Sequence, residues 1–170
     1  MSIAVEAAIA SDRNFDCAGM EKKSRTVKVK LKRTRPGAAL PRHHSEHSAG
    51  MDLAAALDGT FTLGSLERAA IPTGLAIEIP AGFEGQVRPR SGRALREGLA
   101  LINSPGTIDA DYRGEIQVLV VNLGREPIVI QPGDRIAQLI IAPVSRTELI
   151  EVEVLAASRR GSGGFGHTGR

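Results

Sequence analysis

The sequence predicts an all-β fold built from many short strands, and three observations support this prediction. Strand-like segments recur at roughly ten-residue spacing. Turn signals separate them, for example at Pro80-Ala-Gly82, Ser104-Pro-Gly106 and Gln131-Pro-Gly133. Hydrophobic residues make up 42% of the chain but aromatic residues only 3%, so the core must consist mainly of Val, Ile, Leu and Ala. These patterns are typical of a sandwich, a barrel or a jelly roll.

The expected elements follow from local periodicity. In the first strand Val27, Val29 and Leu31 alternate with lysines, which predicts a half-buried strand whose lysine side chains protect a sheet edge. Short helical turns are expected at residues 64–68 and 91–98, the second with Ser91 as its N-cap. The expected strands are residues 27–32, 59–63, 69–71, 75–79, 83–88, 99–102, 115–122, 128–130 and 135–142.

The composition along the chain divides it into three parts. Residues 1–24 show no consistent period and are expected to be a flexible N-terminal extension. Residues 25–157 carry the strand signals and are expected to form one β unit. In residues 158–170 five of the thirteen residues are glycine and four are Arg or His, so we expect a mobile Gly/Arg-rich arm that buries little apolar surface.

Charge and cysteine usage favour a soluble cytoplasmic protein. Cys17 is the only cysteine, no signal-peptide pattern precedes it, and no apolar run approaches the ~20 residues of a membrane helix. The net charge is +3, and eight basic residues lie between Lys22 and Arg35. Because the lysines in this run alternate with apolar residues, we interpret it as the solvated face of a strand and expect no nucleic-acid partner.

Five short segments carry residues suited to chemistry on a phosphate ester. Arg90 and Arg160 are suited to bidentate contacts with phosphate oxygens, and the glycines near Arg160 allow close approach of backbone amides. A carboxylate beside such cations can accept a proton from water or orient a hydrated metal ion. The segments are Ala49-Gly-Met-Asp-Leu53, Arg88-Pro-Arg-Ser-Gly92, Asn103-Ser-Pro-Gly-Thr-Ile-Asp-Ala-Asp-Tyr-Arg-Gly-Glu115, Arg135-Ile-Ala-Gln-Leu139 and Arg160-Gly-Ser-Gly-Gly-Phe-Gly-His-Thr168.

Other phosphate- and metal-binding motifs fit the sequence less well. The C-terminal arm lacks the Gly-Lys-Ser/Thr of a P-loop. Asp109, Asp111 and Gly114 match three positions of an EF-hand loop, but Arg113 and Val120 occupy positions that need oxygen ligands. The histidines at 43, 44 and 47 lack cysteine or acidic partners at a structural-zinc spacing beyond Glu46.

In this order and spacing, the five segments resemble the five motifs of the trimeric deoxyuridine triphosphatases (dUTPases). The resemblance extends from about residue 27 to the C-terminus. It implies a distorted jelly roll of the β-clip type, assembled as a homotrimer with active sites shared between subunits. It also implies Mg²⁺-dependent hydrolysis of dUTP to dUMP and pyrophosphate, which limits uracil in DNA and supplies dUMP for thymidylate synthesis.

The resemblance also implies residue roles. Asp109 would activate the water that attacks the α-phosphorus, and Tyr112 would lie against the deoxyribose. Uracil would be read by Asn103 and by the hairpin backbone of Gly106, Thr107, Ile108 and Asp109. Phosphates would be contacted by Arg90, Ser91, Gly92 and Gln138, with Gln117 nearby. Asp52 would lie in the second shell of the metal, through water. From the arm, Arg160 with Gly163 and Gly164 would bind the γ-phosphate and Phe165 would stack on uracil.

Three residues depart from the family pattern. Arg93 replaces a usually apolar residue, His167 replaces a common serine, and His43 replaces a common aromatic residue. Three other functions stay open at this point: a dCTP deaminase of the same fold, a trimeric module that binds nucleotide as a regulatory signal, and a nucleic-acid binder that uses the basic run and the arm. Ammonia release from dCTP, nucleotide turnover and salt-dependent gel shifts distinguish them.

Overall fold

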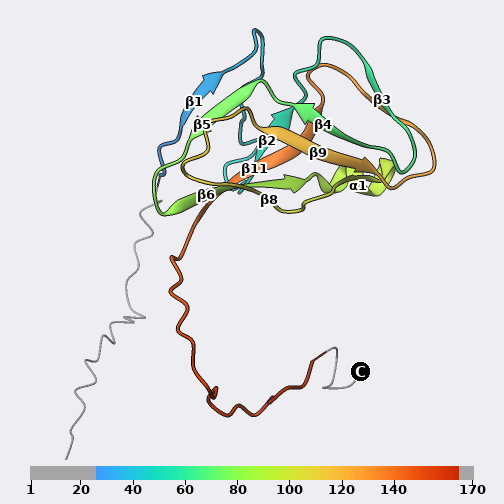
Figure 1. Ribbon diagram of the computed structural model, residues 1–170. Coiled ribbons are helices and arrows are strands. Elements are labelled where there is room, and N and C mark those ends of the chain that lie inside the picture. The colour runs from blue at the N-terminus through green and yellow to red at the C-terminus, as the bar shows by residue number, and fades with distance from the viewer. Residues whose placement is uncertain (1–25, 165–170) are drawn as a thin grey trace, which may run out of the picture.

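A computed structural model describes residues 26–164. It contains eleven strands and one short helix (Figure 1). Each of the nine expected strands is present, with ends within three residues of the expected positions. The strands are β1 Lys30–Arg33, β2 Met51–Ala54, β3 Phe61–Leu63, β4 Arg68–Pro72, β5 Leu75–Glu78, β6 Phe83–Pro89, β7 Leu99–Leu101, β8 Gly106–Ile108, β9 Gln117–Asn122, β10 Ile128–Ile130 and β11 Arg135–Pro143, and the helix is α1 Ser91–Glu97.

All strand pairs are antiparallel, as expected for a jelly roll. The largest sheet has the order β2-β11-β6-β8, and a second has the order β4-β9-β7. Two further pairs, β1-β5 and β10-β3, complete the body. In Figure 1 the helix α1 lies at one end of this body, and the chain that follows β11 leaves from the other end. The prediction of an all-β distorted jelly roll is confirmed.

The core consists of aliphatic side chains, as the scarcity of aromatic residues requires. In β9 the side chains of Val118 and Val120 are fully buried, whereas Gln117 before them and Leu119 between them are exposed. This alternation is the period of a strand with one face on the core. Asn122 continues the buried face, and its amide donates to Leu63 O (3.1 Å) and Glu126 O (2.8 Å), so it is buried with its hydrogen bonds satisfied.

The first strand is shorter than predicted and has the expected lysine face, but it is not half-buried, because all four of its residues are exposed, Leu31 included. It begins at Lys30 rather than at residue 27, and it pairs with β5. Val29 packs against the core while Lys28, Lys30 and Lys32 are exposed. Lys30 donates a hydrogen bond to Glu78 on the neighbouring strand (2.8 Å), which lowers the pKa of that carboxyl.

Three details of the sequence prediction are corrected. β2 and β8 were not expected as strands. Residues 64–67 form a hydrogen-bonded turn rather than a helical turn, Leu66 in it has a φ of 62°, and residue 68 begins β4. The N-cap of α1 is Arg90, not Ser91, and it makes no side-chain capping bond. By contrast, the last strand ends at Pro143, one residue beyond its expected end at residue 142.

Candidate functional site

The predicted base-reading residues line one hollow of about 260 Å³, here called the hairpin hollow. It lies where β8 leads through a turn to β9, and Val87 of β6 contributes to its wall. Strand pairing builds this wall, because β8 is hydrogen-bonded to β6 with Gly106 opposite Val87. The residues that line it are Val87, Asn103, Gly106, Thr107, Ile108, Asp109, Tyr112, Glu115, Ile116, Gln117 and Leu119.

A glycine allows the Asn103 amide to approach the β8 backbone. A Cβ atom at Gly106 would lie 3.1 Å from Asn103 Nδ2 and 3.4 Å from Val87 Cβ. Such contacts are tight, so any larger residue at this position would displace the amide or the strand. Asn103 therefore presents its amide beside backbone groups of β8, an arrangement that can offer both donors and acceptors to a planar ring.

Tyr112 is held over the end of the same turn. Its hydroxyl donates to Glu115 O (3.1 Å), and its backbone N–H donates to Asp109 O (3.1 Å). A Cβ atom at Gly114 would clash with the Tyr112 hydroxyl, so the ring packs directly on that glycine. Its side chain is 46% exposed, which leaves a ring face available to a ligand.

Glu115 fastens the base of the hairpin to the body. Its Oε1 accepts a hydrogen bond from Gly74 N (2.7 Å) and one from Arg35 Nε (3.3 Å). The charge of this carboxylate is therefore already compensated, and its role in the hollow is structural.

Asp109 differs from Glu115 in having no such partner. Within residues 26–164 its carboxylate makes no hydrogen bond or ion pair, and the residue is exposed at the rim of the hairpin hollow. An unpartnered carboxylate beside a ligand-sized hollow is available to hold a water molecule and accept its proton.

The predicted phosphate-contacting residues line a second hollow of about 440 Å³, here called the arginine hollow. Register explains the grouping, because Gln138 of β11 lies opposite Asp52 of β2 on one side and Arg88 of β6 on the other. Gln138 Nε2 also donates to Pro89 O (2.9 Å), next to Arg90. The lining residues are His44, Ser48, Ala49, Gly50, Asp52, Arg88, Arg90, Ser91, Gly92, Arg135, Gln138 and Ile140.

Asp52 is the electrostatic centre of the arginine hollow. Its side chain is only 14% exposed and forms ion pairs with Arg90 Nε (3.2 Å) and Arg135 Nη1 (3.1 Å). His44 Nε2 also lies 3.3 Å from Asp52 Oδ2. Arg90 is a phosphate contact predicted from the sequence, whereas Arg135 and His44 are not among the predicted site residues. Arg135 is 83 residues from Asp52 in the chain, so only the pairing of β2 with β11 brings them together.

The arginine hollow is better suited to a metal ion that arrives bound to the substrate than to a metal ion held by the protein alone. Across residues 26–164, no group of three or more His, Cys, Asp or Glu side chains could hold a metal. The Asp52 oxygens are already shared between two arginines and a histidine. Mg²⁺ usually keeps several waters and binds through few carboxylates plus substrate phosphates. An Asp52 that acts through water is consistent with that preference.

The predicted arm residues are not joined to either hollow in one chain. After Val144, whose N–H donates to Gly82 O, residues 145–164 make hydrogen bonds only among themselves. Arg160 Nε donates to Gly163 O (2.8 Å), and Arg160 is exposed. Gly164 is half-buried. Phe165 and His167 lie outside the described residues.

The two hollows also remain separate within the chain. Their lining sets have no residue in common, and the adjacent residues Val87 and Arg88 of β6 belong to different hollows. The structure therefore gathers the predicted residues into two groups plus the arm. Within residues 26–164 no helix is long and apolar enough to span a membrane.

Comparisons with known proteins identify the family of the chain. The dUTPase family model matches residues 37–169. The deoxyuridine 5'-triphosphate nucleotidohydrolase of Syntrophotalea carbinolica is 54% identical over 145 residues, which cover 85% of this chain and 99% of that protein. The enzyme of the same name from Anaeromyxobacter sp. (strain Fw109-5) is 58% identical over 146 residues, which cover 85% of this chain and 98% of that protein.

Solved structures give the same result. A dUTPase of Staphylococcus bacteriophage 80alpha, solved with dUpNHpp, aligns with a TM-score of 0.77 at 29% identity, covering 85% of this chain and all of that one. A phage phi11 dUTPase, described with a structural Mg(II) ion, aligns with a TM-score of 0.69 at 26% identity, covering 75% of this chain and 97% of that one. The chain belongs to the dUTPase family and is a dUTP diphosphatase.

Proposed function

We propose that this enzyme hydrolyses dUTP by in-line attack of water on the α-phosphorus, with Asp109 orienting the water and accepting its proton. The oxygen of water forms the new bond to phosphorus, the bond to the bridging oxygen of the β-phosphate breaks, and pyrophosphate leaves with the electron pair. The observation that carries this proposal is the free, exposed carboxylate of Asp109 at the rim of the hairpin hollow. Because aspartate is a weak base, it works mainly by positioning and by late proton transfer.

The hairpin hollow is suited to deoxyuridine. Asn103 and the backbone of β8 provide donors and acceptors for the edge of uracil, and Thr107 and Gln117 complete the wall. The half-exposed ring of Tyr112 would lie against the deoxyribose and disfavour a 2′-hydroxyl. The tight packing around Gly106 keeps the backbone of β8 close to the base, which disfavours a 5-methyl group.

Base choice gives a first test. Uracil presents an acceptor at position 4, whereas cytosine presents a donor, so dCTP would place donor against donor. A buried polar mismatch of this kind lowers kcat/KM by ~10⁴ to 10⁵. We expect that ratio between dUTP and dCTP in pyrophosphate-release assays. Comparable values for the two substrates would refute the assignment of Asn103 and β8, and ammonia release from dCTP would indicate a deaminase.

The arginine hollow would hold the phosphates. Residues 90–92, here called the phosphate loop, would supply a guanidinium, a hydroxyl and a backbone amide, and Gln138 would add its side-chain amide. Mg²⁺ would be held by phosphate oxygens, with Asp52 reached through water, and would neutralise phosphate charge. The cations of the hollow then favour the charge that builds up as the bond to pyrophosphate breaks.

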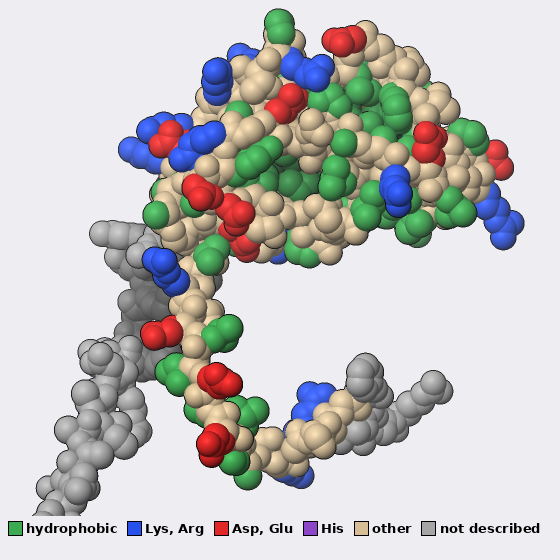
Figure 2. Space-filling view, in the orientation of Figure 1, with side chains coloured by type: hydrophobic (Ala, Val, Ile, Leu, Met, Phe, Trp, Pro, Cys, Tyr) green, Lys and Arg blue, Asp and Glu red, His purple; other side chains and the backbone are tan. Residues whose placement is uncertain are grey.

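Assembly as a homotrimer would unite the two hollows. In one chain the hairpin hollow and the arginine hollow share no lining residue, so a site made from both is naturally built across two subunits. The segment after β11 also favours assembly. Ile150, Val152 and Val154 are 78%, 54% and 83% exposed in the single chain, and Figure 2 shows apolar and acidic side chains alternating along it. A third subunit would contribute Arg160 and Phe165 from its arm.

Shared sites predict complementation between two inactive variants. Asp109→Asn removes the hairpin half of a site and Arg90→Ala removes the arginine half. Co-refolding them in equal amounts should restore about a quarter of wild-type activity, because about one site in four combines two intact halves. Light scattering should give the mass of a trimer for both parents and for the mixture. Mixed trimers without recovered activity would show that each site lies within one chain.

A further inference from the structure

Arg93 directly follows the phosphate loop in the chain, and its side chain is buried and makes contacts that none of the proposed roles uses. Arg93 is 9% exposed, although it belongs to a short surface helix. Its guanidinium donates to Glu97 Oε2 (2.9 Å from Nε), to Asp134 Oδ2 (3.4 Å) and to Val129 O (3.4 Å). Burying an arginine is unfavourable unless its charge and donors are compensated, and here two carboxylates and a carbonyl compensate them.

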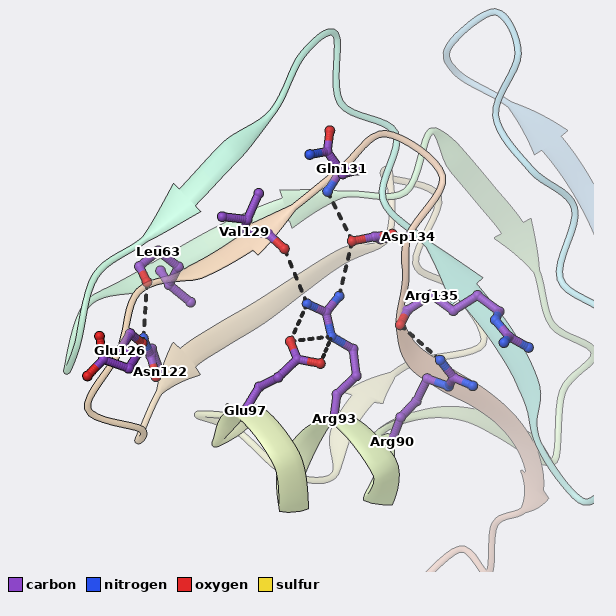
Figure 3. A network of polar contacts seen from close by, with 10 residues as sticks. All are labelled: Leu63, Arg90, Arg93, Glu97, Asn122, Glu126, Val129, Gln131, Asp134 and Arg135. Carbon is purple, nitrogen blue, oxygen red and sulfur yellow. Dashed lines mark hydrogen bonds and ion pairs between the residues drawn. The ribbon is translucent and has the colours of Figure 1, made fainter.

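These contacts cross between different parts of the chain. Glu97 is in α1 itself, one helical turn further on. Val129, in contrast, belongs to β10, and Asp134 belongs to the connection that leads from β10 into β11. Figure 3 shows Arg93 extending from the helix to this connection, with Glu97 beside it. The pair with Glu97 alone would stabilise only the helix. The contacts with Asp134 and Val129 attach the helix to the rest of the fold.

The connection that receives Arg93 is itself firmly held. Asp134 Oδ2 accepts a hydrogen bond from Gln131 N (3.0 Å), and Asp134 N donates to Gln131 O (3.0 Å). Ala55, just after β2, donates its N–H to Asp134 O (2.8 Å) and accepts from Gly133 N (2.8 Å). The connection is therefore a fixed point between β2 and β11, which are the strands that carry Asp52 and Gln138.

Arg90 contacts the residue that follows. Arg90 Nη1 donates to Arg135 O (3.1 Å) while Arg93 donates to the side chain of Asp134, so two arginines one helical turn apart hold adjacent residues (Figure 3). Ala94 N donates to Arg90 O (3.0 Å), which closes the first turn of α1 around the phosphate loop. Any rotation of that turn would have to break the contacts of both arginines.

We infer that Arg93 is a positioning residue, which fixes the phosphate loop against the β10–β11 connection and so aligns Arg90, Ser91 and Gly92 with Gln138 on β11. This inference rests on the proposed phosphate-binding role of the loop. Arginine is suited to the task because its rigid planar fork spreads its N–H donors over three nitrogens, which here reach acceptors on different elements, whereas a lysine presents one compact ammonium. Small displacements of a group that positions substrate can lower rates by ~10²-fold.

The test compares ligands with and without phosphates. In Arg93→Leu, kcat/KM for dUTP and the affinity for dUDP as an inhibitor should each fall about tenfold or more, while the affinity for deoxyuridine should stay at the wild-type value. Arg68→Leu on β4 is the matched control, because Arg68 is exposed and lies outside both hollows, and it should change none of the three. Circular dichroism and thermal melting would monitor the fold of each variant.

A swapped pair separates positioning from helix stabilisation. The double variant R93E/E97R keeps an ion pair within α1 but places a carboxylate against Asp134, so it should remain as impaired in dUDP binding as Arg93→Leu. Recovery of dUDP affinity in the swap, or an equal loss for dUDP and deoxyuridine in Arg93→Leu, would overturn the inference.

Two further variants keep the test decisive. If Arg93→Leu does not fold, Arg93→Lys takes its place, because it retains the positive charge without the planar fork. It should show the same selective loss of dUDP affinity. Wild-type dUDP affinity in Arg93→Lys would also overturn the inference. Arg90→Ala tests the underlying role of the loop separately. Unchanged dUDP affinity in Arg90→Ala would refute the phosphate assignment itself, whatever Arg93 does.

Discussion

Replacing Asp109 by asparagine should leave dUTP binding nearly unchanged and lower the single-turnover rate by ~10² to 10⁴-fold. Asparagine keeps the size of the side chain and its ability to hold a water molecule, but it cannot accept the proton. The Asp109 carboxylate has no hydrogen bond or ion pair within residues 26–164, so the change should not disturb the fold. Rapid-quench measurement of dUMP formation and analogue binding would report the two effects separately.

Asp111→Asn is the matched control for this experiment. Asp111 is an exposed carboxylate two residues further along the same turn and is outside the lining of the hairpin hollow. It should retain the wild-type rate. A turnover rate of Asp109→Asn within tenfold of the wild type, or an equal loss in Asp111→Asn, would contradict the assignment of Asp109 as the group that accepts the proton.

A chain that ends at Ser158 should fold normally and lose most of kcat/KM, by ~10²-fold or more. Among the described residues, none after Val144 makes a hydrogen bond to the body of the fold, so removal of the arm should not destabilise the jelly roll. Ordering a glycine-rich segment costs roughly 1 kcal/mol per residue, and only strong contacts with a triphosphate offset that cost. The closed arm would exclude water and fix the γ-phosphate.

The control for the truncation is a chain that lacks residues 1–24, which carry none of the proposed site residues. Both shortened chains should show the circular dichroism spectrum and melting temperature of the full chain, and only the C-terminal truncation should lose pyrophosphate release. Arg160→Ala and Phe165→Ala in the full chain should reproduce part of that loss. A folded C-terminal truncation with near-normal activity would show that the arm takes no part in the reaction.

The strands were predictable because their burial follows a local pattern. β9 alternates buried valines with exposed residues, and β10 is a short run of β-branched residues between turns. β2 and β8 were missed because each is only a few residues long and contains part of a chemical motif, Asp52 in one and Gly106 in the other. In both cases the pairing with a neighbouring strand, not the local sequence, makes the segment a strand.

The members of the two hollows were predictable as motifs, whereas their contacts were not. Asp52 and Arg90 stand out in the sequence, but Arg135 becomes a partner of Asp52 only through the register of β2 and β11. The burial of Arg93 likewise depends on Asp134 and Val129, 41 and 36 residues away. Contacts between residues so far apart in the chain produce no periodic pattern in the sequence, so only the fold reveals them.

The most direct test of the central claim is hydrolysis of dUTP in ¹⁸O-labelled water with Mg²⁺, followed by mass spectrometry of the products. Attack on the α-phosphorus predicts one labelled oxygen in dUMP and none in pyrophosphate, with release from dCTP, dTTP and UTP far slower than from dUTP. Label in pyrophosphate, or stepwise release of inorganic phosphate, would contradict the proposed attack and the role assigned to Asp109.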